Sequence, residues 1–214
     1  MEKIKVQSLS ESVFERIEQG ILSGEYPVGS YLTENGLSKS LEVSRTPIRE
    51  AISRLTQENL IKETPKGHLV VGVSTSDIVD IYDVRAKIEG VATARCAKSI
   101  TDEELARLGE TVELQEFYTL KGEPEKIKGT DNDFHQTIYN VCGGIYRDIL
   151  SALHKKAQRY RKLSFSDGDR AAQAVREHKE IYAALRAHDE ALCEALAVKH
   201  ILNAKISIIA KKEN

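Results

Sequence analysis

The sequence predicts a mostly α-helical fold in two parts joined by a short linker. Residues 1–73 show three helical patterns followed by two short strand patterns, whereas residues 78–214 show six longer helical patterns and no strand pattern. Between them, the polar segment STSD at 74–77 has the composition of a connection. A chain of 214 residues is long enough for two small domains, each with its own core.

The composition is that of an ordinary globular protein, with 41% hydrophobic and 30% charged residues. No apolar run is long enough to span a membrane, and the N-terminal segment lacks the apolar core of a signal peptide. The three cysteines are widely spaced and form no C-x-x-C motif, which favours buried free thiols in a reducing cytoplasm. The net charge of −2 neither requires nor excludes a polyanionic partner. We therefore expect a cytoplasmic protein that does not bind membranes.

Three helices are predicted in the first sixty residues. The first begins at Leu9 with apolar residues at helical spacing and ends before Gly24. After a turn marked by proline and glycine, Thr33 can cap a short second helix. Ser44 is placed to cap the third helix, and Pro47 falls in its first turn, where a missing N–H breaks no hydrogen bond. The buried face of the third helix is expected to comprise Ile48, Ala51, Ile52 and Leu55.

Two short strands joined by PKG follow the third helix and predict a β-hairpin wing, so that residues 1–73 form a winged helix-turn-helix. Arg45 and Arg49 lie one turn apart at the N-terminal end of the third helix. Arginine can contact guanine or phosphate with two hydrogen bonds, and the helix N-terminus also favours anions. The alternative is a solvated helix face, on which the arginines form ion pairs with Glu42 or Glu50.

The remaining residues predict an antiparallel all-α bundle, because clear helix-breaking residues separate six helical patterns. Thr101 and Glu104 have the spacing of a capping box at the start of the second helix of this part. The first expected helix spans about 78–98. The second begins at 101 and ends at a break at 122–124, and the third runs from that break to 143–144. The last three span about 145–163, 170–187 and 190–211.

Four residues of the bundle are candidates for a metal site. His178 and His200 lie at nearly equal distances from the turn that joins the last two helices, so an antiparallel hairpin brings them level. Asp131 and His135, in the stretch DNDFH, share one face of an earlier helix. If that face meets the last two helices, one carboxylate and three imidazoles converge in a set suited to zinc, nickel, manganese or iron.

The alternative reading of these residues is structural. A single histidine on a helix is more often a packed or surface residue, and Asp131 could simply be solvated. The other histidines, at positions 68, 154 and 188, have no such joint placement and are expected to be ordinary residues.

The N-terminal part resembles the DNA-binding domain of the GntR family of bacterial transcription regulators, from ILSGEYPVG through VSRTPIREAISRL to PKGHLV. The resemblance implies double-stranded DNA as partner, a wing tip that enters the minor groove, and base or phosphate contacts from the third helix. Residues 1–73 carry 9 Lys and Arg against 10 Asp and Glu, so we expect a homodimer on a near-palindromic operator. The implied DNA-contacting residues are Ser44, Arg45, Thr46, Arg49, Lys66 and Gly67.

The C-terminal part, 78–214, resembles the FCD ligand-binding domain of the FadR subfamily, and its six helices resemble the VanR-type subgroup. The resemblance rests on DNDFH, EHKEI and VKHI, and it implies that Asp131, His135, His178 and His200 bind a divalent metal. It also implies a small carboxylate or sugar acid as effector. Arg85 is a candidate for the effector carboxylate, although it could equally pair with Glu89. The weaker effector candidates are Arg159, Tyr160 and Arg161, which could also form a solvated face.

Together these patterns predict a transcriptional regulator, not an enzyme, whose operator binding a small organic acid controls at a metal site. Repression is the commoner outcome in the family that it resembles. One alternative is a DNA-binding regulator with a purely structural metal site. The other is a metal-dependent enzyme, which the absence of an H-E-x-x-H motif and of a clearly placed general base disfavours.

Overall fold

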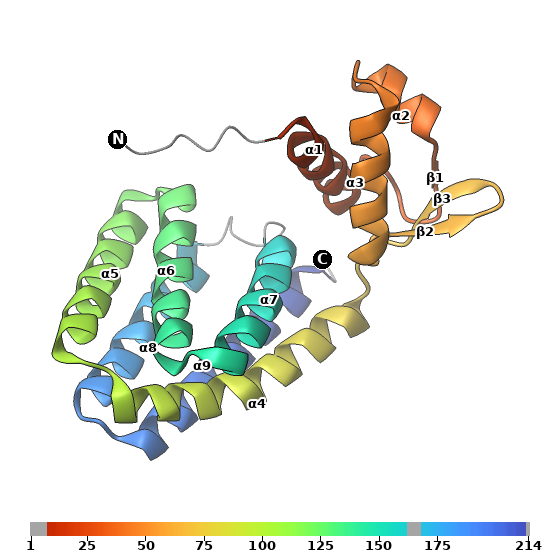
Figure 1. Ribbon diagram of the computed structural model, residues 1–214. Coiled ribbons are helices and arrows are strands. Elements are labelled where there is room, and N and C mark those ends of the chain that lie inside the picture. Colours follow the sequence, from red (N-terminus) through yellow and green to blue (C-terminus); the bar gives the residue numbers. More distant parts are fainter. Residues whose placement is uncertain (1–7, 162–167, 213–214) are drawn as a thin grey trace. The chain divides into compact units, whose positions relative to one another are not determined.

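The computed structural model describes residues 8–161 and 168–212, and the chain divides into two compact units, Met1–Ser74 and Thr75–Asn214 (Figure 1). We call them unit 1 and unit 2 and describe each by itself. Unit 2 begins with a helix at Thr75, so three of the four residues expected in the linker are helical. Asp77 lies in the first turn of this helix, where a carboxylate interacts favourably with the helix dipole.

Unit 1 contains the three predicted helices packed around one apolar core. Ser8 caps the first helix, which ends at Gly24 in the left-handed conformation, as its sequence pattern predicts. Phe14 and Ile17 of the first helix pack with Ile48 and Leu55 of the third, and all four are almost fully buried. The elements of unit 1 are α1 (Leu9–Ser23), β1 (Tyr31–Leu32), α2 (Glu34–Ser40), α3 (Arg45–Gln57), β2 (Ile61–Thr64) and β3 (Gly67–Val70).

The sheet of unit 1 has three antiparallel strands in the order β1-β3-β2. The predicted hairpin is β2 paired with β3, in the register Ile61↔Val70. The additional strand β1 pairs with β3, and two residues are too few to produce a detectable sequence pattern. Gly67 begins β3 with φ of 121°, and a Cβ there would lie 3.0 Å from the carbonyl oxygen of Leu32. Glycine at this position therefore allows β1 and the hairpin to approach each other.

Among the residues that the structure describes, unit 2 contains the six predicted helices and no strand. Thr101 and Glu104 form the predicted capping box, with both reciprocal hydrogen bonds present. Within this part of the chain no helix is long and apolar enough to cross a membrane. The helices are α4 (Thr75–Ser99), α5 (Asp102–Lys121), α6 (Pro124–Cys142), α7 (Gly144–Arg161), α8 (Gly168–Arg186) and α9 (Glu190–Lys212).

The central contact of unit 2 joins α4 to α9, which pack along each other, while α6 and α7 also pack on α4 (Figure 1). Gly90 of α4 allows this close approach, because a Cβ there would lie 2.7 Å from Cγ2 of Val198 and 3.2 Å from Cγ of Glu194. Beside the apolar core lies an unusual number of buried polar side chains. They include Arg85, Glu89, Asp131, His135, His154, Glu177, His178 and His200.

Two glycine substitutions should have opposite effects on stability. Gly90→Ala should lower the free energy of unfolding by about 1–3 kcal/mol, because the methyl group overlaps the stiff Val198 side chain. Gly129→Ala, in an exposed part of α6 with nothing within 4 Å of the new Cβ, should raise it by roughly 0.5–1 kcal/mol through helix propensity. Chemical denaturation of both variants measures the difference. Equal effects would contradict the close α4–α9 packing.

Candidate functional site

The predicted DNA-contacting residues lie on the surface of unit 1. Ser44, Arg45, Thr46 and Arg49 are all exposed, whereas the opposite stripe of α3 is buried in the core. Ser44 occupies the N-cap position of α3 but makes no side-chain capping hydrogen bond, in contrast to the prediction from its sequence position. The Ser44 hydroxyl therefore does not accept a hydrogen bond from a backbone N–H of the first turn of α3. Lys66 is exposed at the wing turn beside Gly67.

Arg49 forms an ion pair with Glu34 of α2, with 2.8 Å between Nε and Oε2. The sequence suggested Glu42 or Glu50 as possible partners, and neither forms this contact. The Arg49 side chain remains 63% exposed, so the pair contributes only about 0–1 kcal/mol to stability. Such a weak contact can be exchanged for a contact with a phosphate or base at small cost, and until then it holds the arginine beside α2.

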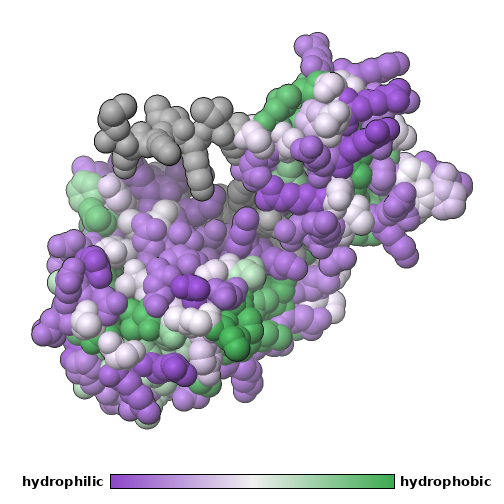
Figure 2. All heavy atoms as spheres, in the orientation of Figure 1, coloured by the Kyte–Doolittle hydropathy of each residue, from purple (hydrophilic) through white to green (hydrophobic). Residues whose placement is uncertain are grey.

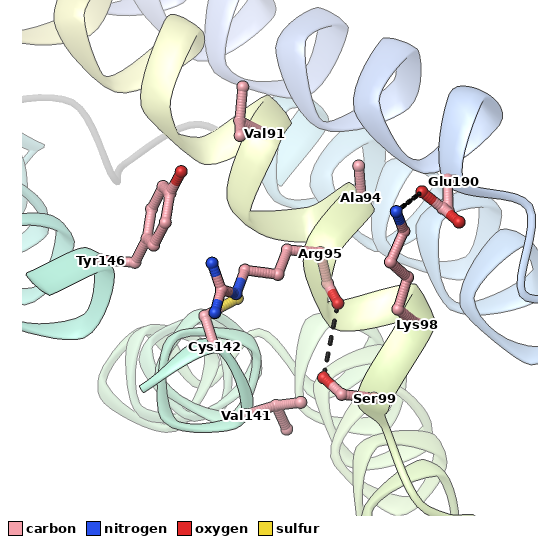
Figure 3. A pocket seen from close by; sticks show the side chains of 9 residues that line it. All are labelled: Val91, Ala94, Arg95, Lys98, Ser99, Val141, Cys142, Tyr146 and Glu190. Carbon is pink, nitrogen blue, oxygen red and sulfur yellow. Dashed lines mark hydrogen bonds and ion pairs between the residues drawn. The ribbon is translucent and has the colours of Figure 1, made fainter. Parts of the chain in front are cut away.

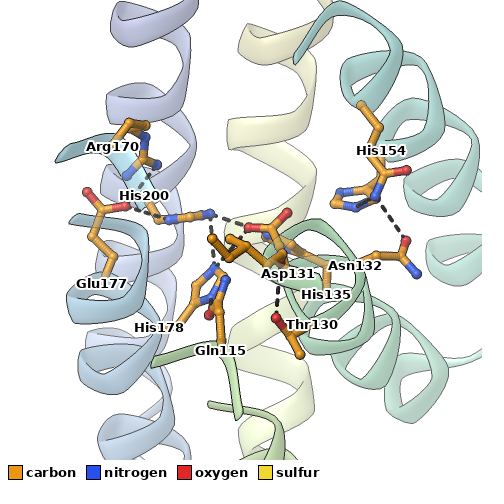
Figure 4. Close-up of polar contacts among 12 residues, drawn as sticks. Gln115, Thr130, Asp131, Asn132, His135, His154, Arg170, Glu177, His178 and His200 are labelled. Atoms are coloured by element: carbon orange, nitrogen blue, oxygen red, sulfur yellow. Dashed lines mark hydrogen bonds and ion pairs between the residues drawn. The ribbon is translucent and has the colours of Figure 1, made fainter. Parts of the chain in front are cut away.

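Three of the four predicted metal ligands, His135, His178 and His200, cluster inside unit 2, and Asp131 lies beside His178 (Figure 4). His135 and Asp131 come from α6, His178 from α8 and His200 from α9, and all four are at most 3% exposed. Nε2 of His200 lies 3.4 Å from Nε2 of His178 and 3.3 Å from Nε2 of His135. Oδ1 of Asp131 lies 4.0 Å from Nε2 of His178. The predicted level placement of the two histidines on α8 and α9 is therefore present in the structure.

Each of the three imidazoles is also held at its other nitrogen, Nδ1. The Nδ1 atoms of His135 and His200 lie 2.7 Å from carboxylate oxygens of Glu89 and Glu177, respectively. The Nδ1 atom of His178 lies 2.7 Å from Oε1 of Gln115. Because these oxygens accept hydrogen bonds, each Nδ1 carries the proton and each Nε2 presents a lone pair. Three lone pairs thus point toward one small region.

The residues that hold Nδ1 could not be identified as such from the sequence. Glu177 directly precedes His178 in the chain, yet it contacts His200 on the neighbouring helix. Gln115 lies on α5, 63 residues before its partner, and carries no sequence signal of this role. Glu89 was expected only as a possible partner of Arg85. These contacts depend on how five helices pack, which residue spacing within one helix does not encode.

Arg85 is fully buried, and the structure shows the pairing with Glu89 that the sequence left open. Its Nη2 lies 3.0 Å from a Glu89 oxygen and 3.1 Å from Nδ1 of His154. The Tyr139 hydroxyl donates a hydrogen bond of 2.6 Å to the same carboxylate. Burial alone would raise the pKa of Glu89, but the Arg85 charge and the His135 contact hold it well below its ordinary value. Glu89 is therefore ionised and balances Arg85.

His154 lies in this network as a packed and hydrogen-bonded residue, and the cluster of possible metal ligands comprises His135, His178 and His200. His154 is 1% exposed on α7, and its ring centroid lies 4.7 Å from that of His135. Its Nε2 lies 3.0 Å from Nε2 of Gln158, which donates to Oδ1 of Asn132 at 3.1 Å. The position of His154 beside His135 depends on how α7 packs on α6, which the spacing of residues in the sequence does not show. The side chains of Arg159, Tyr160 and Arg161 lie outside the described residues.

The electrostatics keep His200 neutral at physiological pH. Burial lowers the pKa of His200 to about 4, although its hydrogen bond with Glu177 acts in the opposite direction. Burial would raise the pKa of Glu177, but the hydrogen bond from His200 and the charge of Arg170 lower it to about 2. A neutral imidazole held by an ionised carboxylate is the form in which histidine binds metal ions.

Metal-free protein should lose stability as the pH falls from 6.5 to 4.5. In this window an unfolded His200, with a pKa near 6.5, takes up a proton that the folded protein does not accept, so acid favours unfolding. The expected contribution is about 2–3 kcal/mol. Chemical denaturation across this window, after chelator treatment, measures it. The variant His200→Gln should show a smaller loss, and an unchanged pH dependence would contradict the assignment.

Each of the two units matches a known protein family. Residues 9–71 match the model of bacterial regulatory proteins of the gntR family, and residues 80–203 match the FCD domain. The chain is 33% identical over 126 residues to the gluconate operon transcriptional repressor of Bacillus licheniformis, covering 59% of this chain but only 52% of that protein. It is 24% identical to the HTH-type transcriptional repressor RspR of Escherichia coli over 204 residues, 94% of this chain and 90% of that protein.

Solved structures show the same fold. The structure of Escherichia coli McbR/YncC covers 97% of this chain with a TM-score of 0.72 and 23% identity, and 99% of that structure is matched. A regulator from Rhodococcus sp. RHA1 covers 94% with a TM-score of 0.67 and 20% identity, with 97% of its own chain matched. The chain therefore belongs to the GntR family of bacterial regulatory proteins: it is a DNA-binding transcriptional regulator rather than an enzyme, and an FCD domain follows its DNA-binding domain.

Proposed function

We propose that this regulator is a repressor whose operator binding is controlled by a small carboxylate or sugar acid at a divalent metal ion. Asp131, His135, His178 and His200 would hold the ion. The observation that carries the proposal is the convergence of three Nε2 atoms whose Nδ1 atoms are each held by an acceptor oxygen. Without a cation, three lone pairs and a buried carboxylate would repel one another.

The spacing of the nitrogens fits such an ion. Tetrahedral coordination with metal–nitrogen bonds of about 2.0–2.1 Å places two ligand nitrogens about 3.3–3.4 Å apart. The two Nε2–Nε2 distances that involve His200 are 3.3 and 3.4 Å. Three imidazoles and one carboxylate suit zinc, nickel, manganese or iron, and a bound ion would supply a positive charge and open positions for an acid oxygen.

Polar groups beside His135 would hold an effector. His154, Asn132 and Gln158 form a connected set of hydrogen-bonding side chains there. Such groups suit the hydroxyls of a sugar acid, while the metal attracts its carboxylate. Arg85, predicted as a contact for the effector carboxylate, also pairs with Glu89, which holds His135. Arg159 and Arg161 remain predicted contacts from α7. The name of the Bacillus licheniformis relative, a gluconate operon repressor, supports the same class of effector.

On DNA, the arginines of α3 would contact bases or phosphates in the major groove, with Ser44 and Thr46 assisting and Lys66 and Gly67 reaching the minor groove. We propose a homodimer on a near-palindromic operator. Unit 2 offers a surface for it, because hydrophobic residues of α4 and of the start of α7 are exposed (Figure 2). This surface comprises Val84, Val91, Ile145 and Ile149.

Arg49→Ala should remove specific operator binding, with a loss of about 1–3 kcal/mol for each half-site. The physical reason is that Arg49 is the exposed cation one turn into α3, and its Glu34 contact is weak. A fluorescence anisotropy titration with operator and unrelated DNA measures both affinity and specificity. Arg16→Ala is the matched control, since Arg16 is also an exposed arginine paired with a glutamate but lies on α1. Equal specificity in both variants would show that the recognition helix is misassigned.

The test of the whole proposal combines metal content with the response to acids. Glu177→Gln should weaken metal binding about 10–100-fold, because the amide holds His200 less strongly than the carboxylate does. Glu180→Gln is the control, as Glu180 lies on the same helix but pairs with Lys199 at the surface. The wild type and the control should retain the metal after purification without chelator, as measured by elemental analysis.

In the same experiment, sugar acids should change the operator affinity of the wild type and of Glu180→Gln in a metal-dependent way. Glu177→Gln should need a higher metal concentration for the same response to the acid. Metal binding without any acid response would favour a purely structural metal site. Absence of metal from the untreated wild type, together with no uptake on titration, would refute the metal site itself.

A further inference from the structure

The three cysteines of the chain, although widely spaced in sequence, gather around one region of unit 2. Cys96 on α4 and Cys193 on α9 lie in the apolar core and are 0% exposed. Cys142, at the end of α6, packs against that core but is only partly buried. The sequence predicted free, buried thiols and gave no indication that they lie together.

Cys96 and Cys142 are neighbours where α4 packs against α6. The Cys142 thiol donates a hydrogen bond of 2.8 Å to the carbonyl oxygen of Ala92, one turn before Cys96 on α4. The pair lies two helical turns beyond the contact between Glu89 and His135, on the same two helices. The contact between α4 and α6 thus repeats after seven residues on each helix.

Cys142 also lines a pocket of about 680 Å³, which gives small molecules access to its sulfur (Figure 3). Arg95 and Lys98 line the same pocket. Lys98 pairs with Glu190 at 2.8 Å, whereas the Arg95 guanidinium lies 5.6 Å from the Tyr146 ring centre and beside Cys142. Arg95 is therefore the cation placed to stabilise a thiolate at Cys142.

The three thiols differ in reactivity. The neighbouring Cys96 thiol and the charge of Arg95 lower the pKa of Cys142, against the effect of burial. The neighbouring Cys142 thiol and burial raise the pKa of Cys96, and burial raises that of Cys193 to about 11. Since the thiolate is the nucleophile, Cys142 reacts first. Among the described residues, the group of three ligand atoms within 4.8 Å of one another is the histidine cluster, so the sulfurs are too widely separated for one metal ion.

We propose that Cys142 is a peroxide-sensitive thiol and that Cys96 resolves it, so that oxidation joins α4 and α6 through a disulfide bond. The Cys142 thiolate attacks one oxygen of hydrogen peroxide, an S–O bond forms, the O–O bond breaks, and the leaving hydroxide takes up a proton to become water. The Cys96 sulfur then attacks the Cys142 sulfur. The S–S bond forms, the S–O bond breaks, and the departing oxygen leaves as water with the Cys96 proton. Two thiols are oxidised as one peroxide is reduced to two waters.

The test is peptide mapping of full-length protein treated with hydrogen peroxide, alkylated and digested with trypsin without reduction. Cleavage places the three cysteines in separate peptides, 96–98, 129–147 and 187–199. The expected product is peptide 96–98 linked to 129–147, formed in proportion to peroxide and lost after dithiothreitol. A link that involves 187–199, a link between two copies of 129–147, or no peroxide-dependent product would overturn the proposal.

Variants separate the two thiols. Cys96→Ser should abolish the link and leave Cys142 as a sulfenic acid that dimedone labels. Cys193→Ser is the matched control, another core cysteine whose loss should leave the link intact. Arg95→Gln should slow dimedone labelling of Cys142 in the Cys96→Ser background several-fold, and an unchanged rate would remove Arg95 from the proposal. The wild-type map does not depend on whether any variant folds, and none of these readouts requires DNA, metal or effector.

Discussion

Three imidazole rings can face one another in the core of unit 2 only because each is held from behind by a hydrogen-bond acceptor. Glu89 of α4, Gln115 of α5 and Glu177 of α8 fix which nitrogen of each ring carries the proton and how the ring is turned. The rings themselves come from α6, α8 and α9. The positions of the three rings therefore depend on five helices, so the packing of the whole bundle determines the geometry of the site.

The same constraint explains the buried charges around the rings. Removing Arg85 and Glu89 from water is costly, and their attraction offsets the cost only if the remaining polar atoms find partners. Tyr139, His135 and His154 supply such partners. Arg85 thereby supports His135 through Glu89.

Much of the fold could be predicted from the sequence, because caps and breaks such as the Thr101–Glu104 box and Gly122 act locally. The placement of His178 opposite His200 could also be predicted. The two residues lie at nearly equal distances from the tight turn that joins their helices, and both helices have the same rise per residue. What could not be predicted depends on how distant helices meet. His154, Gln115 and the pairing of Cys96 with Cys142 belong to this class. Strand β1 was not predicted, because it is defined by its pairing with β3 and its two residues alone form no strand pattern.

The order of the helices along the chain has a consequence during protein synthesis. Glu89, Gln115 and His135 leave the ribosome first, and Glu177 and His178 follow, but the set is incomplete until α9 delivers His200. Contacts between residues so far apart form late, because long loops must close first. A nascent chain that ends before α9 holds its charged side chains without their final partners. The four residues proposed to hold an ion therefore come together only when α9 docks on α4.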